Sequence, residues 1–114
     1  MKNRFCISVF LYAREGSENI FLEYENAVMP LLKEHTGELL LRISPDRSSE
    51  ADSKIRVPNE IHLIGFSEEK NFRSFLSDPV RKSLEHMRKE SIVFSIVLQN
   101  AETCIPESFY LNNG

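Results

Sequence analysis

Three side chains could take part in chemistry, because each can carry a charge or a proton within a largely apolar segment. His62 lies in the segment EIHLIGF, Arg42 in the segment ELLLRIS, and Tyr12 at the end of an apolar N-terminal segment. An imidazole near a phenol and a guanidinium can exchange a proton during oxidation or isomerisation of a small aromatic or enolic compound. We predict His62, Arg42 and Tyr12 as catalytic residues. The alternative is that His62 is a hydrogen-bonded residue of a subunit interface.

Arg42 has two interpretations, because a guanidinium on apolar surface favours a carboxylate or phosphate partner. That partner is either a ligand or an acidic residue of a second subunit or of the C-terminal segment. Four further residues are predicted to share a sheet face with these side chains and to bind the ligand. They are Ser8, Phe10, Phe66 and Ser95.

The histidines and cysteines do not have the spacing of a metal or cofactor site. His35, His62 and His86 are widely separated and form no HxH or HExxH motif. Cys6 and Cys104 lie near opposite ends of the chain and form no CxxC motif. We therefore expect no metal and no cofactor, with one buried thiol and one thiol in the C-terminal segment.

The composition predicts one folded domain. The chain has 114 residues, of which 41% are hydrophobic and 27% charged, and its net charge is −3. Binding of nucleic acid usually requires a basic surface, and no apolar segment approaches the length of a membrane span. The apolar N-terminal segment is short and is followed directly by Arg14 and Glu15, unlike a signal peptide. We expect a cytoplasmic protein without nucleic-acid or membrane partners.

Periodicity predicts a βαββαβ order of elements. Apolar runs without helical spacing predict strands over 4–12, 38–44, 60–66 and 91–98. Apolar residues at steps of three and four predict helices after the first strand and after the third. Right-handed crossovers then place both helices on one face of a four-stranded antiparallel sheet. We assign residues 1–98 to this domain and 99–114 to a C-terminal tail that closes the sheet or lies on a partner subunit.

Cap residues predict where the helices begin and end. Ser17 and Ser67 are expected at the N-caps of the two helices, and Asp78 before a further segment that starts with Pro79. Gly37 is expected at the C-terminal end of the first helix, where glycine adopts the left-handed conformation.

Side chains alternate between the two faces of a strand, so each strand divides into two sets. The set predicted beneath the helices is Phe5, Ile7, Val9, Leu11, Leu39, Leu41, Ile43, Ile61, Leu63, Gly65, Ile92, Phe94, Ile96 and Leu98. The set predicted on the opposite face is Cys6, Ser8, Phe10, Tyr12, Leu40, Arg42, Ser44, His62, Ile64, Phe66, Val93, Ser95 and Val97. Soluble monomers rarely expose so much apolar surface as this second set carries, so we expect a second copy or the tail to cover it.

Several short motifs resemble the dimeric α/β-barrel superfamily, whose subunits have a ferredoxin-like fold. They are Pro30-Leu31-Leu32, His35-Thr36-Gly37, the stretch 60–66, Phe72-Arg73-Ser74-Phe75, Asp78-Pro79 and Arg88. The similarity covers about residues 4–98 and is greatest to an uncharacterised branch of small domains of unknown function. It implies that two subunits pack sheet to sheet into a shared barrel. The superfamily includes cofactor-independent monooxygenases, muconolactone-isomerase-like enzymes, haem-dependent relatives and proteins without known activity, so the fold does not choose a function.

Two functional hypotheses follow. In the first, the chain is a homodimer that binds a small molecule or acts as an accessory domain, with the second sheet face as its interface. In the second, it is a cofactor-independent monooxygenase or isomerase that acts on a small aromatic or enolic metabolite. Both predict a second copy of the chain as the partner and a small molecule as the ligand.

Overall fold

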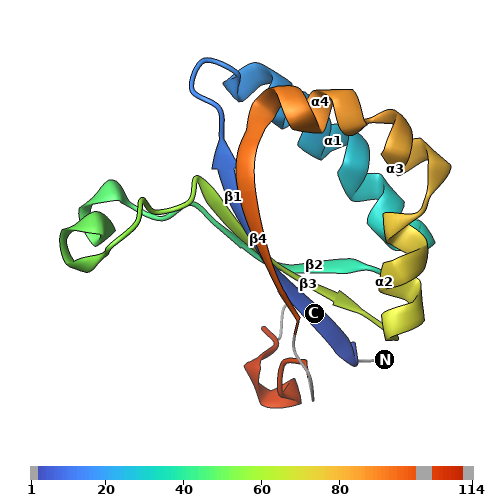
Figure 1. The fold of residues 1–114 in the computed structure, drawn as a ribbon. Helices are drawn as coiled ribbons and strands as arrows, with labels where there is room; N and C mark the ends of the chain where they lie inside the picture. The colour runs from blue at the N-terminus through green and yellow to red at the C-terminus, as the bar shows by residue number, and fades with distance from the viewer. Residues whose placement is uncertain (1–2, 100–103, 112–114) are drawn as a thin grey trace.

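The computed structural model describes residues 3–99 and 104–111, and its centre is a four-stranded antiparallel sheet with the strand order β2-β3-β1-β4. The strands are β1 (Phe5–Ala13), β2 (Glu38–Ile43), β3 (Glu60–Phe66) and β4 (Ile92–Gln99). The helices are α1 (Glu18–Glu34), α2 (Glu69–Leu76), α3 (Pro79–Ser83) and α4 (Glu85–Ser91). All four helices lie on one side of the sheet (Figure 1). The predicted ferredoxin-like βαββαβ order is therefore confirmed, with the second helical region divided into three short helices.

Asp78 and Pro79 divide that second region as predicted. The Asp78 carboxylate accepts a hydrogen bond of 2.7 Å from the backbone N–H of Val80, and Pro79 is the first residue of α3. The predicted N-cap at Ser67 is wrong, because α2 begins one residue later, after Glu68. The Ser67 hydroxyl instead donates to the Thr36 hydroxyl at 2.7 Å.

The end of α1 also differs from the prediction. Thr36, rather than Gly37, adopts a positive φ of 60°. The N–H of Gly37 donates to the carbonyl of Leu32 at 2.6 Å, and a Cβ at residue 37 would lie 2.9 Å from that oxygen and from the Phe66 ring. Glycine is needed here for a close approach of the backbone to the core, not for a left-handed turn.

The assignment of sheet faces from the sequence is wrong for β3, because β1 and β3 pair in an unexpected register. Val9 lies opposite His62, and Ile7 lies opposite Ile64. Residues directly opposite each other share a face, so His62 and Ile64 lie beneath the helices together with the odd-numbered residues of β1. A one-residue change of register exchanges the two faces of a whole strand.

Irregularities in β2 and β4 also exchange the faces of most of these two strands, although Leu39 and Ile92 lie on the helical side as predicted. The pairing of β2 with β3 shifts between Leu39 and Leu41, which places Arg42 opposite His62. The pairing of β4 with β1 shifts between Tyr12 and Ala13. The face away from the helices consequently carries an apolar set that was mostly predicted to lie beneath them. It comprises Phe10, Leu41, Ile43, Ile61, Leu63, Phe94, Ile96 and Leu98, and we call it the outer face.

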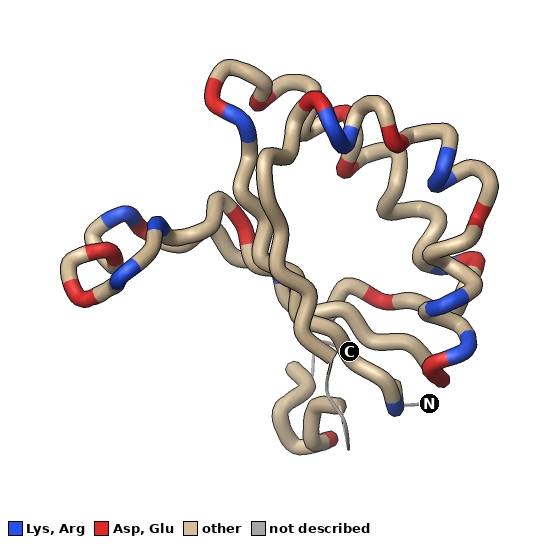
Figure 2. The backbone as a smooth tube through the Cα atoms, in the orientation of Figure 1, with Lys and Arg blue, Asp and Glu red and all other residues tan. Residues whose placement is uncertain are grey.

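The core lies between the sheet and the helices. Ile7, Leu11, Ile64 and Phe66 of the sheet pack against a set of helical side chains. That set comprises Phe21, Tyr24, Val28, Leu31, Leu32, Phe72 and Phe75. Charged residues are gathered on the helices and on the projecting 3-10 segment η1 (Arg47–Asp52), whereas the strands carry few (Figure 2). No helix in the described part of the chain is long and apolar enough to cross a membrane.

Cys6 and Cys104 are joined in a disulfide, with their Cα atoms 5.1 Å apart. The expectation of two separate thiols is therefore wrong, because the C-terminal segment folds back to β1 and brings together residues that are 98 positions apart. Disulfides persist mainly in oxidising compartments, so this bond does not favour the predicted cytoplasmic location, which stays a prediction. Of the predicted tail, residues 100–103 and 112–114 lie outside the described residues.

Candidate functional site

His62 lies at the centre of a buried polar cluster. Its side chain points from the middle strand β3 toward the helices, and the residue is 3% exposed. Glu25 of α1, also 3% exposed, approaches it from the helical side, and Glu60 approaches from two residues earlier on the same strand. Arg42 completes the cluster from the neighbouring strand β2, directly opposite His62. Three elements thus bring together two acids, an imidazole and a guanidinium.

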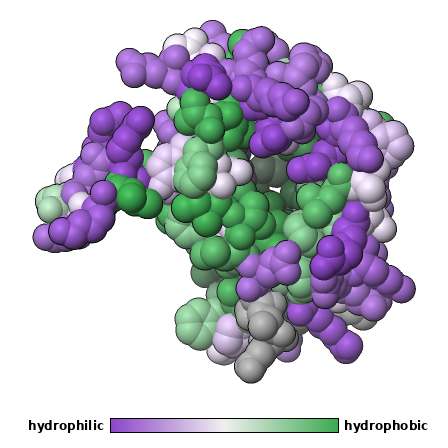
Figure 3. Space-filling view, viewed as in Figure 1, coloured by the Kyte–Doolittle hydropathy of each residue, from purple (hydrophilic) through white to green (hydrophobic). Residues whose placement is uncertain are grey.

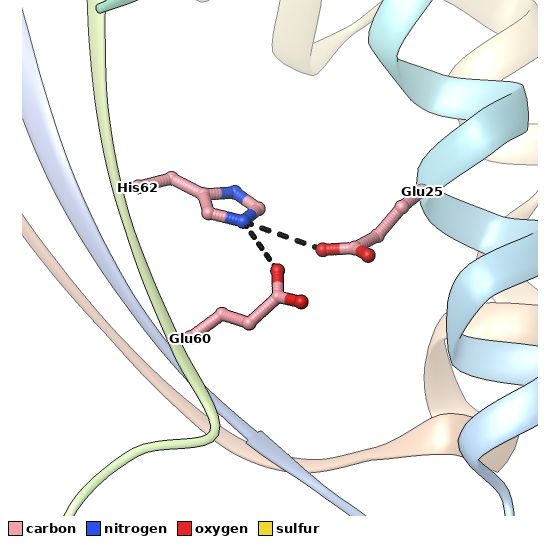
Figure 4. Close-up of side chains that lie close together, drawn as sticks. All are labelled: Glu25, Glu60 and His62. Atoms are coloured by element: carbon pink, nitrogen blue, oxygen red, sulfur yellow. Dashed lines mark hydrogen bonds and ion pairs between the residues drawn. The ribbon is translucent and has the colours of Figure 1, made fainter. Parts of the chain in front are cut away.

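The two carboxylates meet the same ring nitrogen of His62 (Figure 4). Nε2 of His62 lies 2.8 Å from Glu60 Oε1 and 3.3 Å from Glu25 Oε2. Among the described residues, the other ring nitrogen, Nδ1, has no hydrogen-bond partner. The geometry holds the ring by one nitrogen and leaves the second available for proton exchange.

Arg42 binds both acids from the partly exposed side of the cluster. Its Nη2 donates to Glu25 Oε1 at 2.7 Å, and its Nε donates to Glu60 Oε1 at 3.2 Å. The partners of Arg42 are therefore acidic residues, but the prediction that they come from a second subunit or from the C-terminal segment is wrong, because Glu25 and Glu60 belong to α1 and β3 of the same chain. One guanidinium and one imidazolium together balance two carboxylates, which a buried cluster requires.

The cluster shifts the proton affinities of its members. Burial raises the pKa of Glu25, against the hydrogen bond from His62, and the neighbouring Glu60 raises it further. Burial acts to lower the pKa of His62, but the hydrogen bonds to Glu25 and Glu60 outweigh it and raise that pKa overall. Burial acts to raise the pKa of Glu60, but its interactions with Glu25, His62 and Arg42 lower it overall. The imidazolium form of His62 is therefore favoured in the fold.

An apolar cavity of about 150 Å³ adjoins this cluster between the sheet and the helices. His62 and Glu25 form part of its wall, and most of the remaining wall is aliphatic or aromatic. Figure 3 shows an opening between β4 and the helical layer, bordered by hydrophobic residues on the side of β4 and by hydrophilic residues above. An apolar cavity with a few polar groups in its wall is the usual form of a small-molecule site.

The predicted site residues divide between the two faces of the sheet. His62, Arg42 and Ser95 lie on the helical side, where Ser95 lines the cavity. Phe66 lies on the same side but is fully buried in the core.

Three other predicted site residues lie on the side of β1 that faces away from the helices. Tyr12 pairs with Phe94, and its hydroxyl donates to the carbonyl of Arg56 at 2.8 Å. Ser8 lies opposite Leu63, and Phe10 lies opposite Ile61. The expectation that all the predicted site residues share one face is therefore wrong.

Glu25 and Glu60 were missed by the sequence analysis, although each left a signal. Glu25 falls at helical spacing between Phe21 and Val28, so it is a charged residue within the apolar stripe of α1. Glu60 lies two residues before His62 on a strand and therefore shares its face.

Glu25, Glu60 and His62 also offer a possible set of metal ligands, since one ligand atom of each lies within 4.8 Å of the others. Arg42 contacts both carboxylates, however, and its positive charge lies next to the position that a cation would take. Carboxylates already bound to a guanidinium are poor metal ligands, so the arrangement favours a hydrogen-bonded acid–base cluster.

Comparison with known protein families and with curated proteins finds no match to this sequence. Solved structures do match the fold. A protein of unknown function from Rhodopseudomonas palustris aligns with a TM-score of 0.76 at 10% identity, over 93% of this chain and 86% of that chain. A NIPSNAP family protein of unknown function from Agrobacterium tumefaciens aligns with a TM-score of 0.64 at 17% identity, over 92% and 93% of the two chains.

A third match is a dimeric ferredoxin-like protein of unknown function from Jannaschia. It has a TM-score of 0.62 and 20% identity, over 84% of this chain and 96% of that chain. Such similarities show the fold alone, because the same fold supports many functions. The chain is therefore an α+β protein of the ferredoxin-like class, and its structural neighbours include uncharacterised NIPSNAP-like proteins.

Proposed function

We propose that this chain binds a small, mostly apolar molecule in the cavity between the sheet and the helices, and that His62 exchanges a proton with it. One observation carries the proposal: a buried imidazole, held by two carboxylates through Nε2, forms part of the wall of an apolar cavity. A general acid or base needs this combination of fixed orientation, a tuned pKa and access to the ligand.

The proposed reaction is an isomerisation of enol and ketone. Because the pKa of His62 is raised, the imidazolium can deliver its Nδ1 proton to the carbon of an enol. The proton then lost from the enol oxygen restores the imidazolium, so the step needs no further reactant. Of the predicted catalytic residues, this mechanism retains His62 and Arg42. It gives Arg42 the role of positioning Glu25 and Glu60 rather than contacting the ligand.

The test uses 2-indanone, a compact aromatic ketone that exchanges its CH2 hydrogens through the enol. We expect the protein to accelerate deuterium incorporation from D2O, followed by NMR, at least about tenfold over buffer. His62→Gln should abolish this acceleration without weakening binding of 2-indanone. The matched control His86→Gln changes an exposed histidine outside the cavity and should behave like the wild type.

The outcomes separate the two functional hypotheses. If 2-indanone binds but wild type and His62→Gln exchange at the rate of buffer, the chain is a binding protein without this chemistry. If 2-indanone does not bind at millimolar concentration, proton exchange with a neutral ketone in this cavity is contradicted.

We also propose that the chain forms a homodimer through its outer face, with the two sheets packed into a shared barrel. The outer face supports this, because Leu41 is 48%, Phe94 56% and Leu98 54% exposed on one continuous side of the sheet. Covering such a surface with a second copy removes apolar area from water, which is worth about 25 cal/mol per Å² before association costs. A structural neighbour of the same fold is described as dimeric, which agrees with this arrangement.

A further inference from the structure

Arg81 of α3 is a cation in the cavity wall that lacks an acidic partner. It lines the cavity with Phe75, and its guanidinium carbon lies 5.2 Å from the centre of that aromatic ring. No carboxylate of the described residues forms an ion pair with Arg81, although Arg42, Arg73 and Arg88 each have one. The cavity wall therefore holds, on its helical side, a cation that forms no ion pair with the described residues.

The Nε–Nη2 edge of the Arg81 guanidinium makes no hydrogen bond with the described residues. This is the edge that binds carboxylates. Nη1 of Arg81 donates to the carbonyl of Leu76 at 3.2 Å. Nε is buried and has no partner among the described residues. No described residue accepts a hydrogen bond from Nη2 either. Nε and Nη2 together form the fork that holds the two oxygens of a carboxylate, and a buried charged donor without a partner is costly.

Tyr24 supplies a further donor in the wall of the same cavity. It is a buried residue of the cavity wall, and its hydroxyl makes no hydrogen bond with the described residues. Burial raises the pKa of Tyr24, although Arg81 and Arg88 act to lower it, so its hydroxyl keeps its proton. Arg88 also lines the cavity, but its charge is balanced by Glu85. Arg81 is therefore the cation that a ligand can neutralise.

We propose that the ligand of this cavity is a small apolar molecule with a carboxylate, held by the Nε–Nη2 edge of Arg81 and by the Tyr24 hydroxyl. This inference rests on the proposed function, because it names the class of molecule that occupies the same cavity. The cavity volume is close to that of cavities that hold one benzene molecule, so a compact aromatic molecule or a short branched chain fits. With the carboxylate at Arg81, the apolar body lies against the aliphatic and aromatic wall that also contains His62.

The experiment compares benzoate with benzamide, a neutral molecule of nearly the same shape, by isothermal titration calorimetry. We expect the wild type to bind benzoate at least tenfold more tightly than benzamide. Arg81→Gln should reduce that ratio to about one, mainly by weakening benzoate. Arg81→Lys, which keeps the charge but loses the fork, should give an intermediate ratio.

A control variant separates this effect from the net charge of the protein. Arg73→Gln removes an exposed arginine that pairs with Glu69 on α2, and it should leave the ratio unchanged.

The possible failures are distinguishable. Equal affinity of the wild type for benzoate and benzamide, or an unchanged ratio in Arg81→Gln, overturns the carboxylate inference and leaves the cavity as a site for neutral molecules. Binding of neither compound at millimolar concentration contradicts the inference and the proposed function together.

Discussion

The two faces of the sheet are both mainly apolar, but they differ in what lies against them. The helical face includes His62 and Ser95, and Glu25 and Arg81 approach it from the helices. The outer face carries large apolar side chains, several of them about half exposed, around few polar groups. A polar group buried beneath helices must be paired, and the cluster around His62 satisfies this requirement. From this difference we propose that chemistry belongs to the helical face and association to the outer face.

The largest effect is expected from a charge on the outer face. Phe94→Glu should convert the proposed dimer into a monomer, because association would bury the new carboxylate unpaired, at a cost of several kcal/mol. Light scattering should give twice the 13.2 kDa of one chain for the wild type and 13.2 kDa for the variant. Leu22→Glu, on the exposed side of α1, is the control and should stay dimeric. A wild type of 13.2 kDa would contradict an interface on this face.

A smaller but substantial effect is expected from loss of the cation in the helical-face cluster. Arg42→Met removes the guanidinium that pairs with the buried Glu25 and should destabilise the fold by about 2 kcal/mol in chemical denaturation. Arg73→Met removes an exposed pair with Glu69 and should change the free energy of unfolding by about 0.5 kcal/mol or less. Equal effects of the two variants would contradict a special role for the buried cluster.

Tyr12→Phe tests whether the two faces act independently. It removes the hydrogen bond from the Tyr12 hydroxyl to the carbonyl of Arg56, which contributes about 1 kcal/mol to stability. Deuterium exchange of 2-indanone should not change, because Tyr12 lies on the side of β1 opposite to His62. A loss of exchange in this folded variant would show that the outer face participates in the chemistry and would break the comparison.

The smallest effect is expected in the dependence of stability on pH. The pKa of His62 is raised from 6.5 in the fold, so its contribution to stability is complete below pH 6.5 and is lost as pH rises through the raised value. The raised pKa of Glu25 acts in the same direction, from 4.5 upward. Urea denaturation between pH 6 and pH 9 should therefore show a falling free energy of unfolding, with a shallower fall in His62→Gln. A rising free energy would contradict the hydrogen bonds assigned to His62.

Much of the fold was predictable because local rules decide it. Steps of three and four in α1, the apolar runs of the strands, and Asp78 before Pro79 each specify an element through its own residues. The prediction that His62 and Arg42 lie close together also proved correct, since they are direct partners across β3 and β2. Their shared face was placed on the wrong side, because both alternate sets of each strand are largely apolar and alternation alone cannot distinguish them.

The sequence by itself determined the order of the elements, the excess of apolar residues on both sides of the sheet, and the polar residues that had to be buried. Only the tertiary structure decided which side the helices cover, because the pairing register and the irregularities in β2 and β4 depend on neighbouring strands. The same is true of Glu25 and Arg81, which are distant in sequence from His62. They reach its cavity only when α1 and α3 pack over the sheet, and packing between distant segments is what local patterns cannot specify.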